Sequence, residues 1–345
     1  MGMSDTPPSA VLAVDAGNSK TDVAVIGADG SVLGAARGGG FQPPIVGVQA
    51  AIDTLAVAVA AAAADAGLPA SGVASHVSAC LANADLPVEE RQLAQAVQER
   101  GWGTTTDVRN DTFAILRAGL PSGDAPRGVA VVCGAGINCV GMLPDGRTAR
   151  FPAIGQISGD WGGGSHLATE ALWHAARAED GRGGRTELVR ALPAHFGLST
   201  MYELIEALHL GRVEPRRRHE LTPVLFEVAA AGDAVATSVV ERLAEEVVVM
   251  AAVALGKLGL LDEPAPVLLG GGVLAARHPQ LDAMITERLA VRAPKAVADV
   301  VTAPPVLGSG LLGLDHLGAP PEAHVRLAAQ YADAAGRPRP DAAGS

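Results

Sequence analysis

Short apolar runs separated by glycine turns mark the beginning of the chain. Residues 10–14 form an apolar run that leads into Asp15-Ala16-Gly17-Asn18, and a second apolar run over residues 21–26 follows almost directly. A turn at Ala28-Asp29-Gly30 precedes a third run over residues 31–35. Apolar runs of this length joined by tight glycine turns are typical of antiparallel strands. The pattern therefore predicts a three-stranded β-meander.

Helices and further strands alternate after the meander. An alanine-rich stretch predicts a helix, and short apolar runs between polar stretches predict buried strands. Pro87 marks the start of another helix, because proline is favoured at the first helical position. The predicted elements are a helix over 46–66, a strand over 77–81, a helix over 87–100, a strand over 106–108 that leads to Asn110-Asp111, and a helix over 112–118.

The opening pattern then occurs a second time. A strand over 128–133 ends in Gly134-Ala135-Gly136, a strand over 139–143 follows, and an Asp-Gly turn leads to a strand over 148–151. Two halves that both open in this way indicate a duplicated architecture. Further predicted elements are helices over 165–178, 186–196, 201–208, 223–231 and 234–260, and a strand over 266–269 that runs into Gly270-Gly271-Gly272.

These elements predict an α/β protein built from two lobes. We expect a first lobe over residues 1–117, a second lobe over 118–318, and a final segment over 319–345 that holds one proline-initiated helix and a polar end. The chain has 345 residues, of which 48% are hydrophobic, and this is enough for a sizeable core.

Charge and composition narrow the range of partners. The net charge is −11, whereas a nucleic-acid-binding protein usually presents a basic face. The basic run Arg216-Arg217-Arg218 is interpreted as a solvated surface. The odd number of cysteines, three, suits a reducing compartment better than a disulfide framework. Charged residues interrupt the apolar stretch over 239–261, and no signal-peptide pattern occurs, so we expect a cytoplasmic protein without a membrane span.

Four of the turns stand at strand ends and carry candidate chemistry. Gly17 would allow close approach of the backbone to a ligand, Ser19 could contact phosphate oxygens, and Asp15 could hold a Mg²⁺-bound water. The Gly134–Gly136 turn occupies the matching place in the second half. Either hairpin alone could be purely structural, but two in matching places suggest a triphosphate bound from both sides.

Two aspartates stand at predicted helix starts. Asp111 follows a strand, and Asp160 lies in the glycine-rich segment 155–164. Each could be a helix N-cap or a functional carboxylate. The chain has no Gly-x-x-x-x-Gly-Lys-Ser/Thr pattern, and the first glycine turn leads into a strand, which disfavours a dinucleotide-binding fold. At Gly270–Gly272 a flat base could lie against bare backbone.

Taken in order, these segments resemble the N-acetylglucosamine kinase and BadF/BadG/BcrA/BcrD-type ATPase family, which shares the fold of actin and hexokinase. The resemblance covers residues 11–317. It rests on a phosphate-1 motif at 15–21, a catalytic-aspartate motif at 110–111, a phosphate-2 motif at 131–140, a Gly-Asp-x-Gly sugar motif at 159–162 and an adenosine motif at 268–273. It implies two duplicated ribonuclease-H-like lobes with a central cleft for ATP and sugar, and a homodimer.

The resemblance also implies roles for individual residues. Asp111 would be the general base for a sugar hydroxyl, O6, that attacks the γ-phosphorus of ATP, with Mg²⁺ as cofactor. The implied sugar ligands are Gln42, Asp85, Asn138, Gly155 and Asp160. The implied nucleotide contacts are Asp15 (which would also hold the metal), Gly17, Asn18, Ser19, Lys20, Gly134, Ala135, Gly136, Gly270, Gly271 and Gly272.

Two segments depart from the family pattern, and alternatives remain open. Ala135 stands where a hydroxyl residue is usual, and residues 39–44 differ from the amino-sugar kinase pattern. We expect a kinase of an amino sugar, foremost N-acetylglucosamine, with N-acetylmuramic acid, glucosamine and glucose as alternatives. An ATPase activator would need two exposed cysteines for a 4Fe–4S cluster, whereas Cys80, Cys133 and Cys139 lie in or beside predicted buried strands. A sugar sensor would need a DNA-binding domain, for which the residues before Ala10 leave no room.

Overall fold

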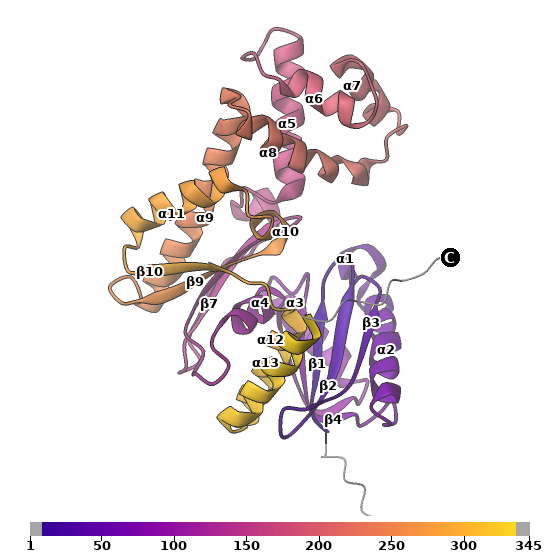
Figure 1. Ribbon diagram of the computed structural model, residues 1–345. Coiled ribbons are helices and arrows are strands. Elements are labelled where there is room, and N and C mark those ends of the chain that lie inside the picture. The colour runs from indigo at the N-terminus through magenta and orange to yellow at the C-terminus, as the bar shows by residue number, and fades with distance from the viewer. Residues whose placement is uncertain (1–8, 336–345) are drawn as a thin grey trace, which may run out of the picture. The chain divides into compact units, whose positions relative to one another are not determined.

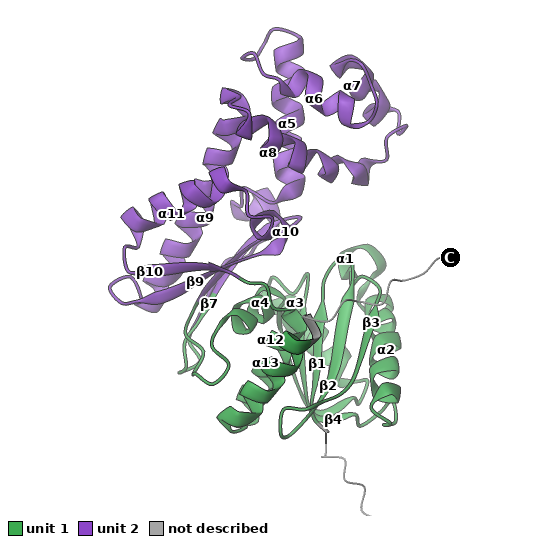
Figure 2. Ribbon diagram, in the orientation of Figure 1, with its two compact units in different colours: residues 1–128, 141–147, 301–345 green, residues 129–140, 148–300 purple. Residues whose placement is uncertain are grey.

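The computed structural model describes residues 9–335 in two compact units (Figures 1 and 2). Unit 1 takes in the chain up to residue 128, residues 141–147, and the chain from residue 301 onward. Unit 2 consists of residues 129–140 and 148–300. The sequence analysis assigned residues up to 318 to the second lobe, so the observed division differs at both of its boundaries.

Each unit is organised around a five-stranded sheet, and the two sheets have the same strand order. The first sheet has the order β3-β2-β1-β4-β5 and the second β10-β9-β6-β7-β8. Counted from the first strand of each half, this is one topology used twice, which confirms the predicted duplication. The strands are β1 Ser9–Ala16, β2 Thr21–Gly27, β3 Val32–Gly38, β4 Ala74–Leu81, β5 Gly103–Asn110, β6 Gly128–Cys133, β7 Ile137–Met142, β8 Thr148–Arg150, β9 Ala265–Gly270 and β10 Ala296–Val300.

Strand direction places the carboxyl ends of three strands at one edge of the first sheet. The β1–β2 and β2–β3 pairs are antiparallel, as expected for the meander, whereas β1–β4 and β4–β5 are parallel. The β6–β9 and β9–β10 pairs of the second sheet are also parallel. The carboxyl edge of such a sheet is the usual place for ligand-binding residues in α/β folds.

Helices cover both faces of the first sheet. Alternate residues of β1 point to opposite faces, so that Leu12 and Val14 join one core cluster and Val11 and Ala13 another. The first cluster includes apolar side chains of α2 Val48–Asp65 and α3 Pro87–Gln98, and the second those of α12 Pro305–His316 and α13 Pro321–Ala335. The other helices of unit 1 are α1 Pro43–Val46 and α4 Thr112–Gly119.

Helix α12 is not predicted by the sequence pattern because it contains three glycines. Gly308, Gly310 and Gly313 lower its helical propensity, but the packing needs them. A Cβ on Gly308 would lie 1.8 Å from the carbonyl oxygen of Ala114 in α4, and one on Gly313 would lie 2.4 Å from Val11 in β1. These glycines therefore allow α12 to approach both α4 and the sheet.

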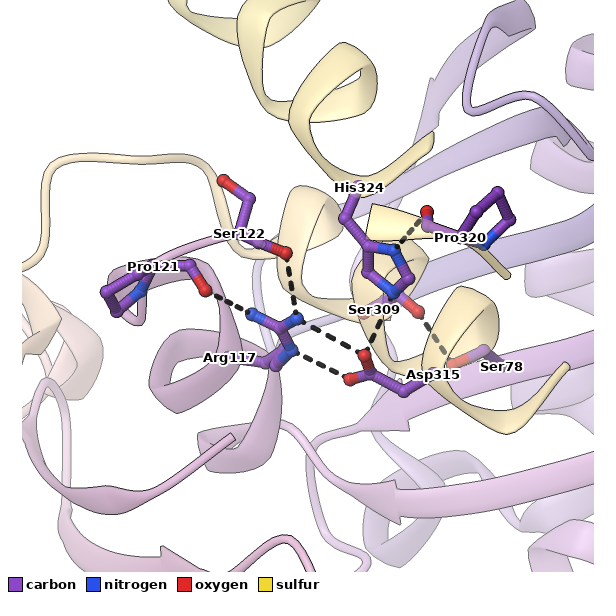
Figure 3. Close-up of polar contacts among 8 residues, drawn as sticks. All are labelled: Ser78, Arg117, Pro121, Ser122, Ser309, Asp315, Pro320 and His324. Carbon is purple, nitrogen blue, oxygen red and sulfur yellow. Dashed lines mark hydrogen bonds and ion pairs between the residues drawn. The ribbon is translucent and has the colours of Figure 1, made fainter. Parts of the chain in front are cut away.

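A buried ion pair also links α4 to the carboxy-terminal helices (Figure 3). Arg117 is fully buried, and its Nε and Nη2 donate to the two carboxylate oxygens of Asp315 in α12 at 2.7 and 3.2 Å. His324 of α13 lies with Nε2 2.9 Å from Asp315 Oδ1. Residues 305–335 are thus attached to the first unit by charge as well as by apolar contact.

The other secondary structure of unit 2 is helical. Its helices are η1 Gly155–Ser158, α5 Gly164–Glu179, α6 Leu188–His195, α7 Met201–His209, η2 Pro215–Glu220, α8 Leu221–Ala230, α9 Ala234–Leu258, α10 Gly271–Ala275 and α11 Pro279–Arg292. The sequence pattern did not predict α10, α11, β10 or the short helices η1 and η2, whereas the boundaries of the other elements of this unit were predicted to within a few residues. Its final predicted helix matches α13, and the predicted polar end after residue 336 lies outside the described residues.

Among the described residues, one helix meets the length and hydropathy criteria for a membrane span. This helix is α2, which the sequence analysis predicted only as an alanine-rich helix. Ile52, Leu55 and Val59 on its inner face are buried in the core of unit 1 against the sheet. Packing of this kind explains its apolar composition, because core helices of globular proteins pass the same test.

Candidate functional site

The carboxyl edge of the first sheet holds two aspartates at the ends of parallel strands. Asp15 is the penultimate residue of β1, and Asp111 directly follows β5. The strand β4 lies between β1 and β5, and the backbone N–H of Asp111 donates to Leu81 at its end, at 3.2 Å. The sheet thus brings together two acids that stand far apart in the sequence.

Asp111 is not a helix cap through its side chain. It occupies the position before α4, but its carboxylate makes no capping hydrogen bond there. Asn110 performs that function, since its Oδ1 accepts from the N–H of Thr112 at 3.0 Å. Desolvation raises the pKa of Asp111 to about 6, although nearby backbone N–H groups favour its ionised form. The carboxylate is therefore available for chemistry and ionised at neutral pH.

Asp15 is a buried carboxyl with an unfavourable environment for its charge. It is only 7% exposed. Desolvation raises its pKa to about 8, the negative charges of Asp111 and Asp22 contribute further, and Lys20 opposes them. Such a carboxylate is stabilised by a cation. Mg²⁺ prefers oxygen ligands and is commonly held by one or two carboxylates together with substrate phosphates.

No group of three or more His, Cys, Asp or Glu side chains in residues 9–335 is arranged to hold a metal by itself. The acids at this edge could therefore supply only one or two of the ligands of a Mg²⁺ ion. Asp15 is the residue that would hold it, and phosphates of a bound nucleotide would supply the remaining ligands.

The phosphate-1 turn is joined to the segment predicted to contact sugar. The N–H of Gly17 donates to Lys20, which closes the turn, and the N–H of Phe41 donates to Gly17, both at 2.9 Å. The Gln42 side-chain amide donates to the carbonyl of Asn18 at 2.8 Å. A Cβ on Gly40 would lie 2.1 Å from that carbonyl oxygen, so glycine is required for this close approach. Two predicted site residues, Asn18 and Gln42, are thus brought together.

Lys20 has a partner within its own unit. Its Nζ lies 3.1 Å from Asp22, which also accepts two hydrogen bonds from Arg37. Burial alone would raise the pKa of Asp22, but these hydrogen bonds from Arg37 and Lys20 lower it overall. Ser19, by contrast, is exposed at the tip of the turn.

Two asparagines that the sequence analysis did not select organise this edge. Asn110 is buried and donates to Asp85 Oδ1 at 2.8 Å, while it also caps α4. Asn83 donates to Asn18 Oδ1 at 3.0 Å and has a positive φ of 63°. Asparagine tolerates that backbone region better than most residues, which was the available sequence signal.

In unit 2 the phosphate-2 turn is fastened to the start of α5 by backbone contacts. The carbonyls of Gly134 and Ala135 accept from the N–H groups of Gly164 and Ser165 at 2.8 and 3.1 Å. A Cβ on Gly163 would lie 2.5 Å from both the Ala135 oxygen and the Cα of Gly136. Ala135 and Gly136 are exposed, so a ligand could approach their backbone from solvent.

The glycines predicted to lie on the adenosine side pack against the same turn. Gly271, at the start of α10, has φ of +81°, and a Cβ there would lie 2.5 Å from the backbone of Cys133 at the end of β6. Gly270 ends β9, and no atom within 4 Å would obstruct a Cβ on Gly272. The strand ends β6 and β9 thus carry the Gly134–Gly136 and Gly270–Gly272 segments side by side.

The remaining predicted sugar residues of unit 2 lie in two places. Asn138, in β7, accepts from the N–H of Cys139 through its side chain at 2.7 Å. Gly155 and Asp160 lie in one loop, where the N–H of Gly155 donates to Asp160 Oδ2 at 2.9 Å. Asp160 is therefore anchored within its own loop and caps no helix by a side-chain hydrogen bond, since Gly163 stands before α5.

The three cysteines are unsuited to bind a surface cluster. Cys80, Cys133 and Cys139 are all buried and free. Burial raises the pKa of each thiol, to about 12 for Cys80 and Cys133. Because a cluster ligand is an accessible thiolate, these positions disfavour the iron–sulfur activator alternative.

A topology used twice, with a glycine turn at the carboxyl edge of each sheet, defines an α/β protein with the fold of actin and hexokinase. A family model described as the BadF/BadG/BcrA/BcrD ATPase family matches residues 12–301. The chain belongs to this family, which confirms the resemblance.

Known kinases are similar to the chain in sequence. An N-acetyl-D-glucosamine kinase of Dictyostelium discoideum is 26% identical over 210 residues, which are 60% of this chain and 65% of that protein. An N-acetylmuramic acid/N-acetylglucosamine kinase of Clostridium acetobutylicum is 25% identical over 193 residues, which are 56% of this chain and 62% of that protein. Each match therefore spans less than two thirds of the relative's length.

A solved structure named as a candidate N-acetylglucosamine kinase from Chromobacterium violaceum superimposes with a TM-score of 0.67. It is 23% identical, and the alignment covers 89% of this chain and 99% of that one. This likeness shows the fold.

Proposed function

We propose that the protein is an ATP-dependent kinase that transfers the γ-phosphoryl group to the 6-hydroxyl of an amino sugar, with N-acetylglucosamine as the foremost substrate. The observation that carries the proposal is the side chain of Asp111. This carboxylate lies at the carboxyl end of β5, makes no helix-capping hydrogen bond, and has its pKa raised to about 6. Its neighbour Asn110 caps the start of α4, so the side chain of Asp111 is not used as the helix cap. Family membership and the two kinase relatives support the reaction class.

In the proposed reaction Asp111 accepts the proton of the sugar hydroxyl as its oxygen attacks the γ-phosphorus. Phosphoryl transfer proceeds through a loose transition state, so the proton can leave late and an ordinary carboxylate suffices as base. Mg²⁺, when bound, would neutralise charge on the phosphates, and Asp15 would hold it.

The other residues would bind and orient the two substrates. The phosphate contacts would come from Gly17, Asn18, Ser19 and Lys20 of unit 1 and from Gly134, Ala135 and Gly136 of unit 2. Since Ala135 has no hydroxyl, backbone N–H groups would be the donors from that turn. The adenosine contacts would be Gly270, Gly271 and Gly272, and the sugar contacts Gln42, Asp85, Asn138, Gly155 and Asp160.

The proposal extends to the setting of the enzyme. We infer a cytoplasmic homodimer, in line with the family resemblance, that meets ATP and sugar in solution. Light scattering of the purified full-length chain would measure its mass, and a monomer at micromolar concentration would contradict the dimer.

The decisive test is ADP release with Mg-ATP against a panel of sugars. The panel contains N-acetylglucosamine, N-acetylmuramic acid, N-acetylmannosamine, glucosamine and glucose. We expect turnover with an amino sugar and a loss of roughly 100-fold or more in kcat for Asp111→Asn, since general-base catalysis contributes about 10²–10⁴-fold.

The matched control is Asp107→Asn, the same change on the same strand, where Asp107 pairs with Arg109 at 2.7 Å. This variant should keep wild-type kcat. A near-normal kcat in Asp111→Asn would remove Asp111 as base, and ADP release that no sugar stimulates would contradict the kinase.

A further inference from the structure

The loop that carries Asp160 is closed by hydrogen bonds from its own residues. Gly155 N–H donates to Asp160 Oδ2 at 2.9 Å, and Asp160 N–H donates back to the carbonyl of Gly155 at 3.2 Å. The hydroxyl of Ser158 lies 2.5 Å from the same oxygen, Asp160 Oδ2. Gly155 and Gly159 have φ of 82° and 85°, so the chain turns back sharply at both ends of this short segment.

The single proton of the Ser158 hydroxyl is directed to Asp160. The backbone N–H of Ile154 donates to Ser158 Oγ at 3.0 Å, so the hydroxyl acts there as acceptor. Asp160 Oδ2 and the carbonyl of Gly155, at 2.9 Å, compete for its own proton. An ionised carboxylate is the stronger acceptor and forms the shorter contact.

Both donors converge on one oxygen of the carboxylate. Asp160 Oδ2 receives the Gly155 N–H and the Ser158 hydroxyl, whereas Oδ1 accepts no hydrogen bond from residues 9–335. Two donors on one oxygen fix the rotation of the carboxylate plane. The loop is largely exposed, with Ile157 85% exposed, and Asp160 itself is half-buried, so a ligand could approach its carboxylate from solvent.

We propose that Ser158 is a positioning residue that orients the carboxylate of Asp160 to receive a sugar hydroxyl. The inference rests on the proposed sugar-kinase function and deepens it. Without the Ser158 hydroxyl, Gly155 N–H alone would hold Oδ2, and the carboxylate could rotate away from the sugar. The loss should appear in sugar recognition and leave nucleotide recognition unchanged.

The test measures KM for sugar, KM for ATP and kcat in Ser158→Ala, with the sugar that wild type uses best. We expect the sugar KM to rise ~10- to 100-fold, the range for losing a hydrogen bond to a charged group, and the ATP KM to stay within about twofold. Ser158→Thr keeps the hydroxyl and should restore the sugar KM to within about threefold of wild type. Ser238→Ala, on the exposed side of α9, removes a hydroxyl that donates only to Val235 and should change nothing.

A double-mutant cycle with Asp160→Asn separates positioning from loop stability. Ser158→Ala should have little further effect in the Asp160→Asn background, because no carboxylate remains to be oriented. Equal increases in both KM values, or additive effects in the cycle, would mean a merely structural serine. An unchanged sugar KM would also overturn the inference.

Failure of the proposed function has a different signature. Wild type would then show neither sugar-stimulated ADP release nor calorimetric binding of any panel sugar, and both proposals would fall. If wild type turns over a sugar and Ser158→Ala matches it, only the inference on Ser158 is refuted.

Discussion

Replacing Asp15 by asparagine should stabilise unit 1 while it abolishes turnover. Asp15 is buried at the end of β1, faces Asp22 across the β1–β2 pair and is repelled by Asp111. Its pKa is raised from 3.8 to about 8, so the protein without a bound cation carries an unfavourable carboxyl at neutral pH. Binding residues kept at such a cost are a common source of trade-off between stability and activity.

The sign and size of the effect follow from proton linkage. Between pH 4 and pH 8 the folded state holds a proton on Asp15 that the unfolded chain has lost, so stability falls as the pH rises. The free energy of unfolding of the wild type falls by about 1.4 kcal/mol per pH unit over this range, which amounts to a loss of ~4 kcal/mol at pH 7. An asparagine at this position cannot ionise, but its amide must still be desolvated. We therefore expect Asp15→Asn to raise the free energy of unfolding by roughly half of this penalty, ~2 kcal/mol. For a unit of this size that corresponds to an increase of about 5 °C in the melting temperature.

The difference in stability between Asp15→Asn and wild type can be measured by thermal melting at pH 5, 6, 7 and 8 in the absence of nucleotide and Mg²⁺. The melting temperature of Asp15→Asn minus that of wild type should grow with pH and level off near pH 8. The control is Asp22→Asn on the facing residue of β2, which loses its contacts with Lys20 and Arg37 and should not be stabilised. A difference for Asp15→Asn that is zero, negative or constant across pH would refute the reasoning.

Two further predictions concern the base and the packing behind it. The kcat of wild type should rise with pH through a midpoint near 6 and level off above it, because Asp111 must be ionised to accept a proton; a flat profile from pH 5 to 8 would contradict this assignment. Gly308→Ala should lower the free energy of unfolding by ~3 kcal/mol or more, or prevent soluble expression, because its Cβ would lie 1.8 Å from the Ala114 carbonyl. Gly256→Ala in α9, whose Cβ would meet only the end of Leu261 at 3.4 Å, is the control in the same melting assay and should be tolerated.

The strands and turns could be predicted because their signals are local. Apolar runs bounded by glycine and Asp-Gly turns fix the meander in each half, and the repetition of that pattern predicts the duplicated topology that the two sheets share. The return of residues 301–335 to unit 1 could not be predicted in the same way. It depends on contacts between α12 and β1 or α4, and the glycines that permit these contacts hide the helix from a pattern search.

The role of Asp111 was ambiguous in sequence for a physical reason. Asparagine and aspartate are almost equally good helix caps, so the pair Asn110-Asp111 does not tell which of the two makes the cap. The structure shows that Asn110 makes the cap, because its Oδ1 accepts a hydrogen bond from the N–H of Thr112. In the same way, nothing in the sequence pattern distinguishes Ser158 from other serines, because its hydrogen bond to Asp160 exists only in the folded loop.

The two copies of the fold have diverged in charge at equivalent positions, and this bears on their division of labour. Asp15 stands two residues before Gly17 in the first hairpin, and Val132 stands two residues before Gly134 in the second. A carboxylate at the second position would repel phosphates unless another cation were bound there. With Val132 at this position, the second hairpin offers a ligand only its backbone. That backbone is held by the hydrogen bond from Gly164 N–H to Gly134 and by close packing of Gly163. The first hairpin is therefore the one suited to hold a cation, whereas the second could offer only backbone N–H groups to an anionic ligand.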